Sequence, residues 1–152
     1  MEGGSLTKGL PESVLLDSSV VLKWFRKDEI WREAALKLRE AYFAGHMAIF
    51  VPDLLIYEIA NVLRYKPDLT QLQVHEALTS LYDMQISMVE ISQGVIMEAI
   101  QLAYFHAITV YDATFIAMAK YLKVPFITAD EKLIQDLSKI PYVHHISDLT
   151  NL

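Results

Sequence analysis

The sequence predicts a single α/β domain, in which helices cover both faces of a central parallel sheet of about five short strands. The predicted strands are short runs that are apolar throughout, as expected for strands buried on both faces. Helical patterns separate them along the chain, and parallel strands need such crossover segments. The chain has 152 residues, 53% of them hydrophobic, which suits one domain with a substantial core. We assign residues 13–150 to the domain and residues 1–12 to a flexible leader.

The first predicted strand, Ser13–Asp17, is an apolar run that ends in an acid. Ser18 or Ser19 can cap the short helix that follows it, through about Phe25. The remaining predicted elements are the helix Ile30–Ala44, the strand Met47–Val51, a helix from Pro52 to about Tyr65, a helix from Thr70 to about Asp83, the strand Met88–Ile91, the helices Gln93–His106 and Val110–Leu122, the strand Pro125–Thr128, a helix from Asp130 to about Ser138, and the strand Tyr142–Ile146.

Local signals support these boundaries. Ile30 begins the apolar spacing of the second helix, and Gly45 closes it. Pro52 suits the first turn of the third helix, because the N–H that proline lacks is unpaired there. Thr70, followed three residues later by Gln73, forms a capping-box pattern for the next helix.

The segment from Val110 to Asp130 predicts a helix, a tight turn and a buried strand. The helix rises about 1.5 Å per residue and so travels roughly 18 Å. The strand returns at about 3.3 Å per residue, over roughly 13 Å. Asp112, in the first turn of the helix, and Asp130, just past the strand, are therefore expected at the same edge of the fold.

Composition excludes several classes of function. The chain has no Cys, which removes disulfides, thiolate metal sites and cysteine nucleophiles. The formal net charge of −6 argues against coating nucleic acid by charge alone, although bound divalent cations would offset a local acidic cluster. The longest charge-free runs, Ala41–Pro52 and Ala99–Tyr111, fall short of the roughly 18 residues that a membrane span needs. We expect a cytoplasmic protein with no signal peptide and no membrane segment.

Four acids are expected to meet at the carboxyl ends of the strands, where parallel sheets bind ligands. They are Asp17, Glu58, Asp112 and Asp130, each in apolar surroundings where an unpaired charge is costly. The neighbouring sequence offers no matching set of Lys or Arg residues. A cluster of acids without basic partners suits a hard divalent cation, Mg²⁺ or Mn²⁺, which lowers the pKa of a bound water.

Four segments carry a family resemblance: LLDSSVVLKWF, PDLLIYEIANVL, TVYDATFIAMA and FITADEKL. In this order they resemble the four acidic motifs of PIN-domain nucleases, and most closely those of VapC-type toxin ribonucleases of toxin–antitoxin pairs. The resemblance covers the chain from Ser13 to Ile146. Each motif alone is weak, whereas four in order are specific. One departure is Phe115, where many members carry Tyr.

The resemblance implies a PIN-like nuclease domain with a parallel sheet of about five strands. It implies that Asp17, Glu58, Asp112 and Asp130 are the catalytic and metal-binding acids. By the same resemblance, Thr128 matches a hydroxyl position of the family and Asn61 an amide position. The implied activity is Mg²⁺- or Mn²⁺-dependent cleavage of RNA by metal-activated water, from a homodimer with a small antitoxin as partner.

Each acid also has a purely structural interpretation. Asp17 could cap the following helix, and Glu58 could pair with Arg64 or a distant Lys. Asp112 could be a first-turn acid favoured by the helix dipole, and Asp130 a simple N-cap. A capping Asp can still face a metal, so these interpretations do not exclude the site.

The supporting residues have structural alternatives too. Asn61 shares a helix face with Glu58 and could orient it, contact substrate, or be an ordinary surface residue. Thr128 could hydrogen-bond an acid, or be present for its β propensity. For Ser18 we favour the role of helix cap, with hydrogen-bond donor to the site as the second interpretation. His144 and His145 alternate along a strand and cannot readily chelate one ion together.

Two other classes of function can be compared with these residues. A non-catalytic PIN-like module that binds RNA or a partner is the alternative, since the net charge is −6 and the basic surface is thin. A phosphatase with an Asp nucleophile would need a second Asp two residues after Asp17, where Ser19 stands. We therefore set the phosphatase aside.

Overall fold

The computed structural model describes residues 9–137 and 139–149, and it confirms an α/β fold with a five-stranded, all-parallel sheet. The strands are β1 (Ser13–Leu16), β2 (Ala48–Pro52), β3 (Ser87–Val89), β4 (Phe126–Thr128) and β5 (Val143–His145). Their order is β3-β2-β1-β4-β5. The chain winds outward from β1 in both directions, so the carboxyl ends of β1 and β4 flank the switch point where ligands bind in such sheets. Residues 1–8 of the predicted leader lie outside the described residues.

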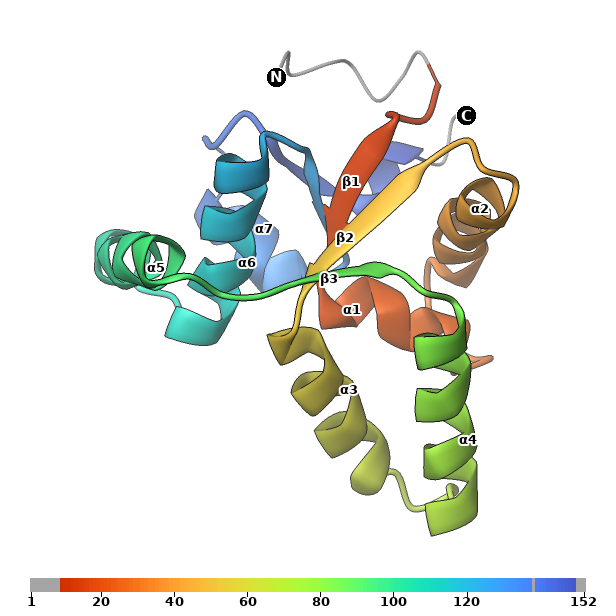
Figure 1. The fold of residues 1–152 in the computed structure, drawn as a ribbon. Coiled ribbons are helices and arrows are strands. Elements are labelled where there is room, and N and C mark those ends of the chain that lie inside the picture. Colours follow the sequence, from red (N-terminus) through yellow and green to blue (C-terminus); the bar gives the residue numbers. More distant parts are fainter. Residues whose placement is uncertain (1–8, 138, 150–152) are drawn as a thin grey trace.

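Helices lie on both sides of the sheet, with α2 on one side and α5 and α6 on the other (Figure 1). The helical segments are α1 (Ser18–Val21), η2 (Leu22–Trp24), α2 (Arg32–Phe43), α3 (Leu54–Arg64), α4 (Gln71–Asp83), α5 (Gln93–His106), α6 (Val110–Leu122), α7 (Glu131–Leu137) and η3 (Ile146–Leu149). Together, α3 and α4 extend from the carboxyl edge of the sheet (Figure 1). This edge is therefore framed by α3 and by the loops after β1 and β4.

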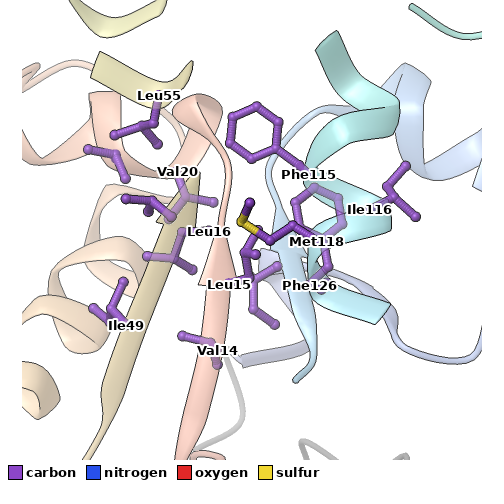
Figure 2. Packing of buried hydrophobic residues seen from close by; sticks show 14 of the residues in the cluster. Val14, Leu15, Leu16, Val20, Ile49, Leu55, Phe115, Ile116, Met118 and Phe126 are labelled. Atoms are coloured by element: carbon purple, nitrogen blue, oxygen red, sulfur yellow. The ribbon is translucent and has the colours of Figure 1, made fainter. Parts of the chain in front are cut away.

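The core is built on the central strand, whose side chains are apolar on both faces. Leu15 points toward α6, while Val14 and Leu16 point to the opposite side (Figure 2). Leu15 is in register with Phe126 of β4, whose ring centroid lies 6.4 Å from that of Phe115 on α6. All five side chains are at most 1% exposed. Burial on both faces explains why the strand reads as a continuous apolar run.

Several predicted boundaries are confirmed by hydrogen bonds. Thr70 and Gln73 form the expected capping box of α4, each side chain bonded to the other residue's backbone N–H. The bounds of α5 and α6 coincide with the predicted ranges. Gly45 follows α2 with φ +75°, the left-handed conformation that glycine adopts readily. The predicted end of α7 at Ser138 lies outside the described residues.

Other local predictions are wrong. Ile30 does not belong to α2 and is 69% exposed, because Trp31 adopts a left-handed backbone (φ 65°) and the helix begins only at Arg32. Pro52 is the last residue of β2 instead of the first turn of a helix. The helix predicted after the first strand is present, but its second half is the 3₁₀ segment η2. The last strand is shorter than predicted, since Ile146 opens η3.

Within the described residues, no single helix is both long and apolar enough to cross a membrane. The consecutive helices α5 and α6 pass that test only as a pair, and they are bent by 119° relative to each other.

Candidate active site

Asp17 lies directly after β1 and is 6% exposed. Its Oδ1 accepts a hydrogen bond from Ser19 Oγ at 2.5 Å, and its Oδ2 accepts one from Thr128 Oγ1 at 2.6 Å. Burial raises the pKa of Asp17 to about 7, against the lowering effect of these two hydrogen bonds. Asp17 occupies the N-cap position of α1 but makes no side-chain capping hydrogen bond, although the nearby backbone N–H of Val20 also lowers its pKa.

Glu58 lies in the second turn of α3 and is half-buried. Ser18 Oγ donates a hydrogen bond to Glu58 Oε1 at 3.1 Å. Of the two roles predicted for this serine, the structure therefore confirms the hydrogen-bond donor to the site, while the N-cap position of α1 is occupied by Asp17. Burial raises the pKa of Glu58, and the nearby charge of Asp112 raises it further. The alternative that Glu58 pairs with Arg64 is wrong, since no ion pair joins these two described residues; the Arg64 guanidinium lies 5.1 Å from the centroid of the Tyr65 ring instead.

Asp112 lies in the first turn of α6, as predicted, and is half-buried. Its backbone N–H donates to Thr109 Oγ1 at 3.0 Å, so Thr109 caps the helix and the Asp112 carboxylate is not needed for capping. Burial raises the pKa of Asp112, and repulsion from Asp130 adds to the rise.

Asp130 follows β4 by two residues, and one of its oxygens has a capping role. Asp130 Oδ1 accepts a hydrogen bond from the backbone N–H of Leu133 at 3.0 Å, which supports the N-cap interpretation for that oxygen. The Asp130 backbone N–H donates to Thr128 Oγ1 at 3.1 Å. Among the described residues, none makes a hydrogen bond to Oδ2, which remains available to a ligand.

Electrostatic interactions link the four acids through Asp112. The charge of Asp112 acts on both Asp17 and Glu58, and the charge of Asp130 acts on Asp112. Among the described residues, no Lys, Arg or His lies within 4.0 Å of any of these four carboxylates. The site therefore concentrates negative charge that the protein itself does not neutralise.

The carboxylate oxygens suit Mg²⁺ or Mn²⁺, which prefer hard oxygen ligands. Within residues 9–137 and 139–149, however, no group of three or more His, Asp or Glu side chains is arranged closely enough to enclose an ion. A hydrated Mg²⁺ does not need such a closed group, because it keeps several waters and is usually held by one or two carboxylates together with substrate phosphates. Asp17, Glu58, Asp112 and Asp130 are the side chains that would hold it.

The sequence predicts Ser19 as a possible helix cap, whereas in the structure its side chain contacts the site on two sides. Besides its bond to Asp17, Ser19 Oγ accepts a hydrogen bond from the backbone N–H of Ala129 at 2.9 Å. It also lies 3.4 Å from Thr128 Oγ1. Ser19 therefore ties the loop after β1 to the loop after β4. The only available signal was its position two residues after a strand-ending Asp, which does not distinguish it from Ser18.

Asn61 lies near Glu58 on α3, and both line an open pocket. No hydrogen bond of the described residues links Asn61 to Glu58, so the structure does not support an orienting role. Glu131, a further acid after the last motif, points away from the cluster: its Oε1 lies 3.1 Å from His145 Nε2. His145 is buried, and its ring faces Glu131 and Ser147.

A model of the PIN domain family matches residues 14–139 of the chain. No curated protein sequence matches it significantly. Among solved structures, a toxin–antitoxin complex from Klebsiella pneumoniae is similar, with a TM-score of 0.63 and 17% identity over 86% of this chain and 94% of that chain.

Two further structures have the same fold. FitAcB from Neisseria gonorrhoeae gives a TM-score of 0.66 at 16% identity, over 88% of this chain and 98% of that chain. VapC20 from Mycobacterium tuberculosis, described as a Sarcin-Ricin loop cleaving toxin, gives 0.63 at 10% identity, over 80% of this chain and 93% of that chain. At these identities the likeness establishes the shared fold.

Proposed function

The chain belongs to the PIN domain family, and from this premise we propose that it is a divalent-metal-dependent ribonuclease, the toxin of a toxin–antitoxin pair. The proposed reaction is hydrolysis of RNA phosphodiester bonds with Mg²⁺ or Mn²⁺ as cofactor. Structural neighbours that come from toxin–antitoxin complexes support the toxin assignment.

The observation that carries the proposal is the position of Asp112. Its carboxylate interacts electrostatically with Asp17, Glu58 and Asp130, which come from three other parts of the fold. Burial and mutual repulsion raise the pKa of three of these acids, so the arrangement costs free energy in the absence of a cation. Acids with raised pKa values gathered at a ligand-binding edge are typical of a functional site.

A bound divalent ion would supply a water of lowered pKa and would offset negative charge on the phosphate. The residues of this chain have separate tasks. Asp17 is held in one orientation by the hydroxyls of Ser19 and Thr128, and Glu58 by Ser18. Asp130 keeps one oxygen for the cap of α7 and presents the other to the site. Fixed carboxylates position the ion and the phosphate without reorganisation during the reaction.

We also propose the assembly in which the enzyme works. A small antitoxin would bind and silence the toxin, which would act as a homodimer on RNA in the cytoplasm. The VapBC-5 structure from Mycobacterium tuberculosis, a member of a family of toxin–antitoxin systems, is a similar fold at 18% identity and supports the search for such a partner.

The test is cleavage of labelled RNA by the purified protein in Mg²⁺ or Mn²⁺ and in EDTA. The wild-type protein is expected to cut in metal and to stop in EDTA, and Asp112→Asn is expected to be inactive. Asp83→Asn, at the exposed end of α4, is the matched control and should cut like the wild type. Cleavage that Asp112→Asn leaves unchanged would overturn the proposal.

The second candidate is a PIN-like module that binds RNA or a partner without cutting it. The formal net charge of −6 and the thin basic surface favour it. Calorimetric titration with Mn²⁺ separates the two candidates. No binding at millimolar metal supports the non-catalytic module, and binding that is lost in Asp112→Asn supports the enzyme.

A further inference from the structure

An open pocket of about 730 Å³ adjoins the acid cluster, within the size range of ligand sites. Glu58 belongs to both the cluster and the pocket, so a molecule in the pocket lies next to the acids. The other lining residues are Leu54, Tyr57, Ala60, Asn61 and Tyr111. The pocket therefore combines two aromatic rings, an amide and small apolar side chains.

The side chains of the two tyrosines are exposed and do not form part of the buried core. Tyr57 on α3 is 75% exposed and Tyr111 on α6 is 62% exposed. Each directly precedes an acid of the site in sequence, Glu58 and Asp112 respectively. Among the described residues, the hydrogen bonds from tyrosine hydroxyls are those of Tyr42, so neither Tyr57 nor Tyr111 is held by one. Both rings are thus free to contact a ligand.

The charges of the residues lining the pocket limit which chemical groups of a ligand it can bind. None of the residues lining this pocket is Lys or Arg, and Glu58 adds negative charge. The pocket itself therefore offers no cation to a phosphate. The contacts it offers are flat aromatic faces and the Asn61 amide, which can bond the edge of a base. Arg64, one turn beyond Asn61 on α3 and exposed, is the nearest cation along the helix for a backbone phosphate.

We propose that Tyr57 and Tyr111 form a stacking subsite for an unpaired nucleobase of single-stranded RNA, beside the scissile phosphate. The assignment rests on the proposed ribonuclease function, and it adds the two side chains of this chain that would hold a base next to the acids. Paired bases in a duplex have their faces covered by their neighbours, so a duplex cannot use the subsite. Stacking on tyrosine tolerates any base, whereas a bond from Asn61 would add a modest preference.

The test measures binding without cleavage. The probe is a fluorescein-labelled single-stranded ten-nucleotide oligoadenylate, and its affinity is read by fluorescence anisotropy in EDTA. Tyr57→Leu and Tyr111→Leu are expected to weaken binding by about five- to 150-fold each, the range for loss of one base–aromatic stack. Tyr57→Phe and Tyr111→Phe keep the ring and should bind within about twofold of the wild type. Tyr121→Leu is the control, since Tyr121 is 68% exposed near the opposite end of α6.

A second probe checks that the bases are what is bound. The same oligoadenylate annealed to its complement should bind with equal affinity to wild type and both Leu variants. Equal loss of single-stranded and duplex binding, or single-stranded binding unchanged in both Leu variants, overturns the subsite. A change of sedimentation coefficient in Tyr57→Leu with unchanged RNA affinity also overturns it, because the face would then be a protein interface.

The two proposals fail separately. If RNA binding depends on the tyrosines but the protein never cleaves RNA, the ribonuclease proposal is rejected and the stacking subsite is retained. If the protein cleaves RNA in the presence of metal but both Leu variants bind RNA like the wild type, the stacking subsite is rejected and the ribonuclease proposal is retained.

Discussion

Thr128 Oγ1 donates a 2.6 Å hydrogen bond to Asp17 Oδ2, joining the carboxyl ends of β4 and β1 across the switch point of the sheet. The same hydroxyl oxygen accepts the backbone N–H of Asp130 at 3.1 Å. Thr128 is fully buried, so neither bond is replaced by water. One hydroxyl thus links two of the four acids.

Replacing Thr128 by Val should impair the site with little change in shape. The substitution removes a hydrogen bond that lowers the pKa of Asp17, so that pKa should rise above its present value of about 7. Loss of such a supporting partner typically lowers metal affinity or activity by about 10- to 100-fold. Mn²⁺ titration and RNA cleavage measure the effect. Thr128→Ser keeps the hydroxyl and should retain most of both, and equal losses in Val and Ser variants would show that the hydroxyl is not responsible.

Asp17→Asn should stabilise the protein near neutral pH. Burial raises the pKa of Asp17 from 3.8 to about 7, which corresponds to a penalty of roughly 4 kcal/mol once the group is ionised. The folded state holds this proton more tightly than the unfolded state, so wild-type stability falls as pH rises from about 4 to about 7. The increase in the free energy of unfolding that Asp17→Asn brings should therefore be largest above pH 7 and vanish near pH 4.

Urea unfolding at several pH values measures that gain. Asp83→Asn replaces an exposed aspartate and should change the free energy of unfolding by no more than about 0.5 kcal/mol. A gain of the same size at pH 4 and pH 8 would contradict the assignment of the penalty to a buried, ionised Asp17.

Mn²⁺ affinity should decrease in acid. Ligating carboxylates must lose their protons, and the pKa values of Asp17, Glu58 and Asp112 are all raised. With the Asp17 pKa at about 7, one competing proton weakens binding about tenfold between pH 8 and pH 6. Calorimetry at the two pH values tests this. Asp17→Asn removes that proton, so its weaker Mn²⁺ binding should depend less on pH, and an unchanged dependence would exclude Asp17 as the competing group.

Phe115→Ala should destabilise the core. Phe115 is 1% exposed and packs near Phe126 between α6 and the sheet (Figure 2). Removing a buried phenylalanine ring costs about 3–5 kcal/mol. Phe105→Ala on α5, where the side chain is 84% exposed, is the control and should change the free energy of unfolding by no more than about 0.5 kcal/mol. Similar unfolding midpoints for the two variants would contradict the packing seen here.

Sequence patterns were most reliable where local interactions decide the structure. The capping box at Thr70 and the bounds of α5 and α6 depend on neighbouring residues, and they agree with the sequence prediction. Ile30 shows the opposite case. Its apolar side chain suits helical spacing, but the left-handed backbone of Trp31, a T-shaped neighbour of His145, sets where α2 begins. That contact spans most of the chain and leaves no local signature.

By itself the sequence determined the fold class and the edge at which the acids meet, because apolar runs specify buried parallel strands and acids after such runs fall at their carboxyl ends. Only the tertiary structure decided how the acids are held. The Ser19 side chain does not cap a helix but donates a hydrogen bond to Asp17. The Ser18 side chain donates one to Glu58, which is 40 residues away in sequence. These contacts depend on side-chain directions across separate elements, which spacing along one chain segment does not encode.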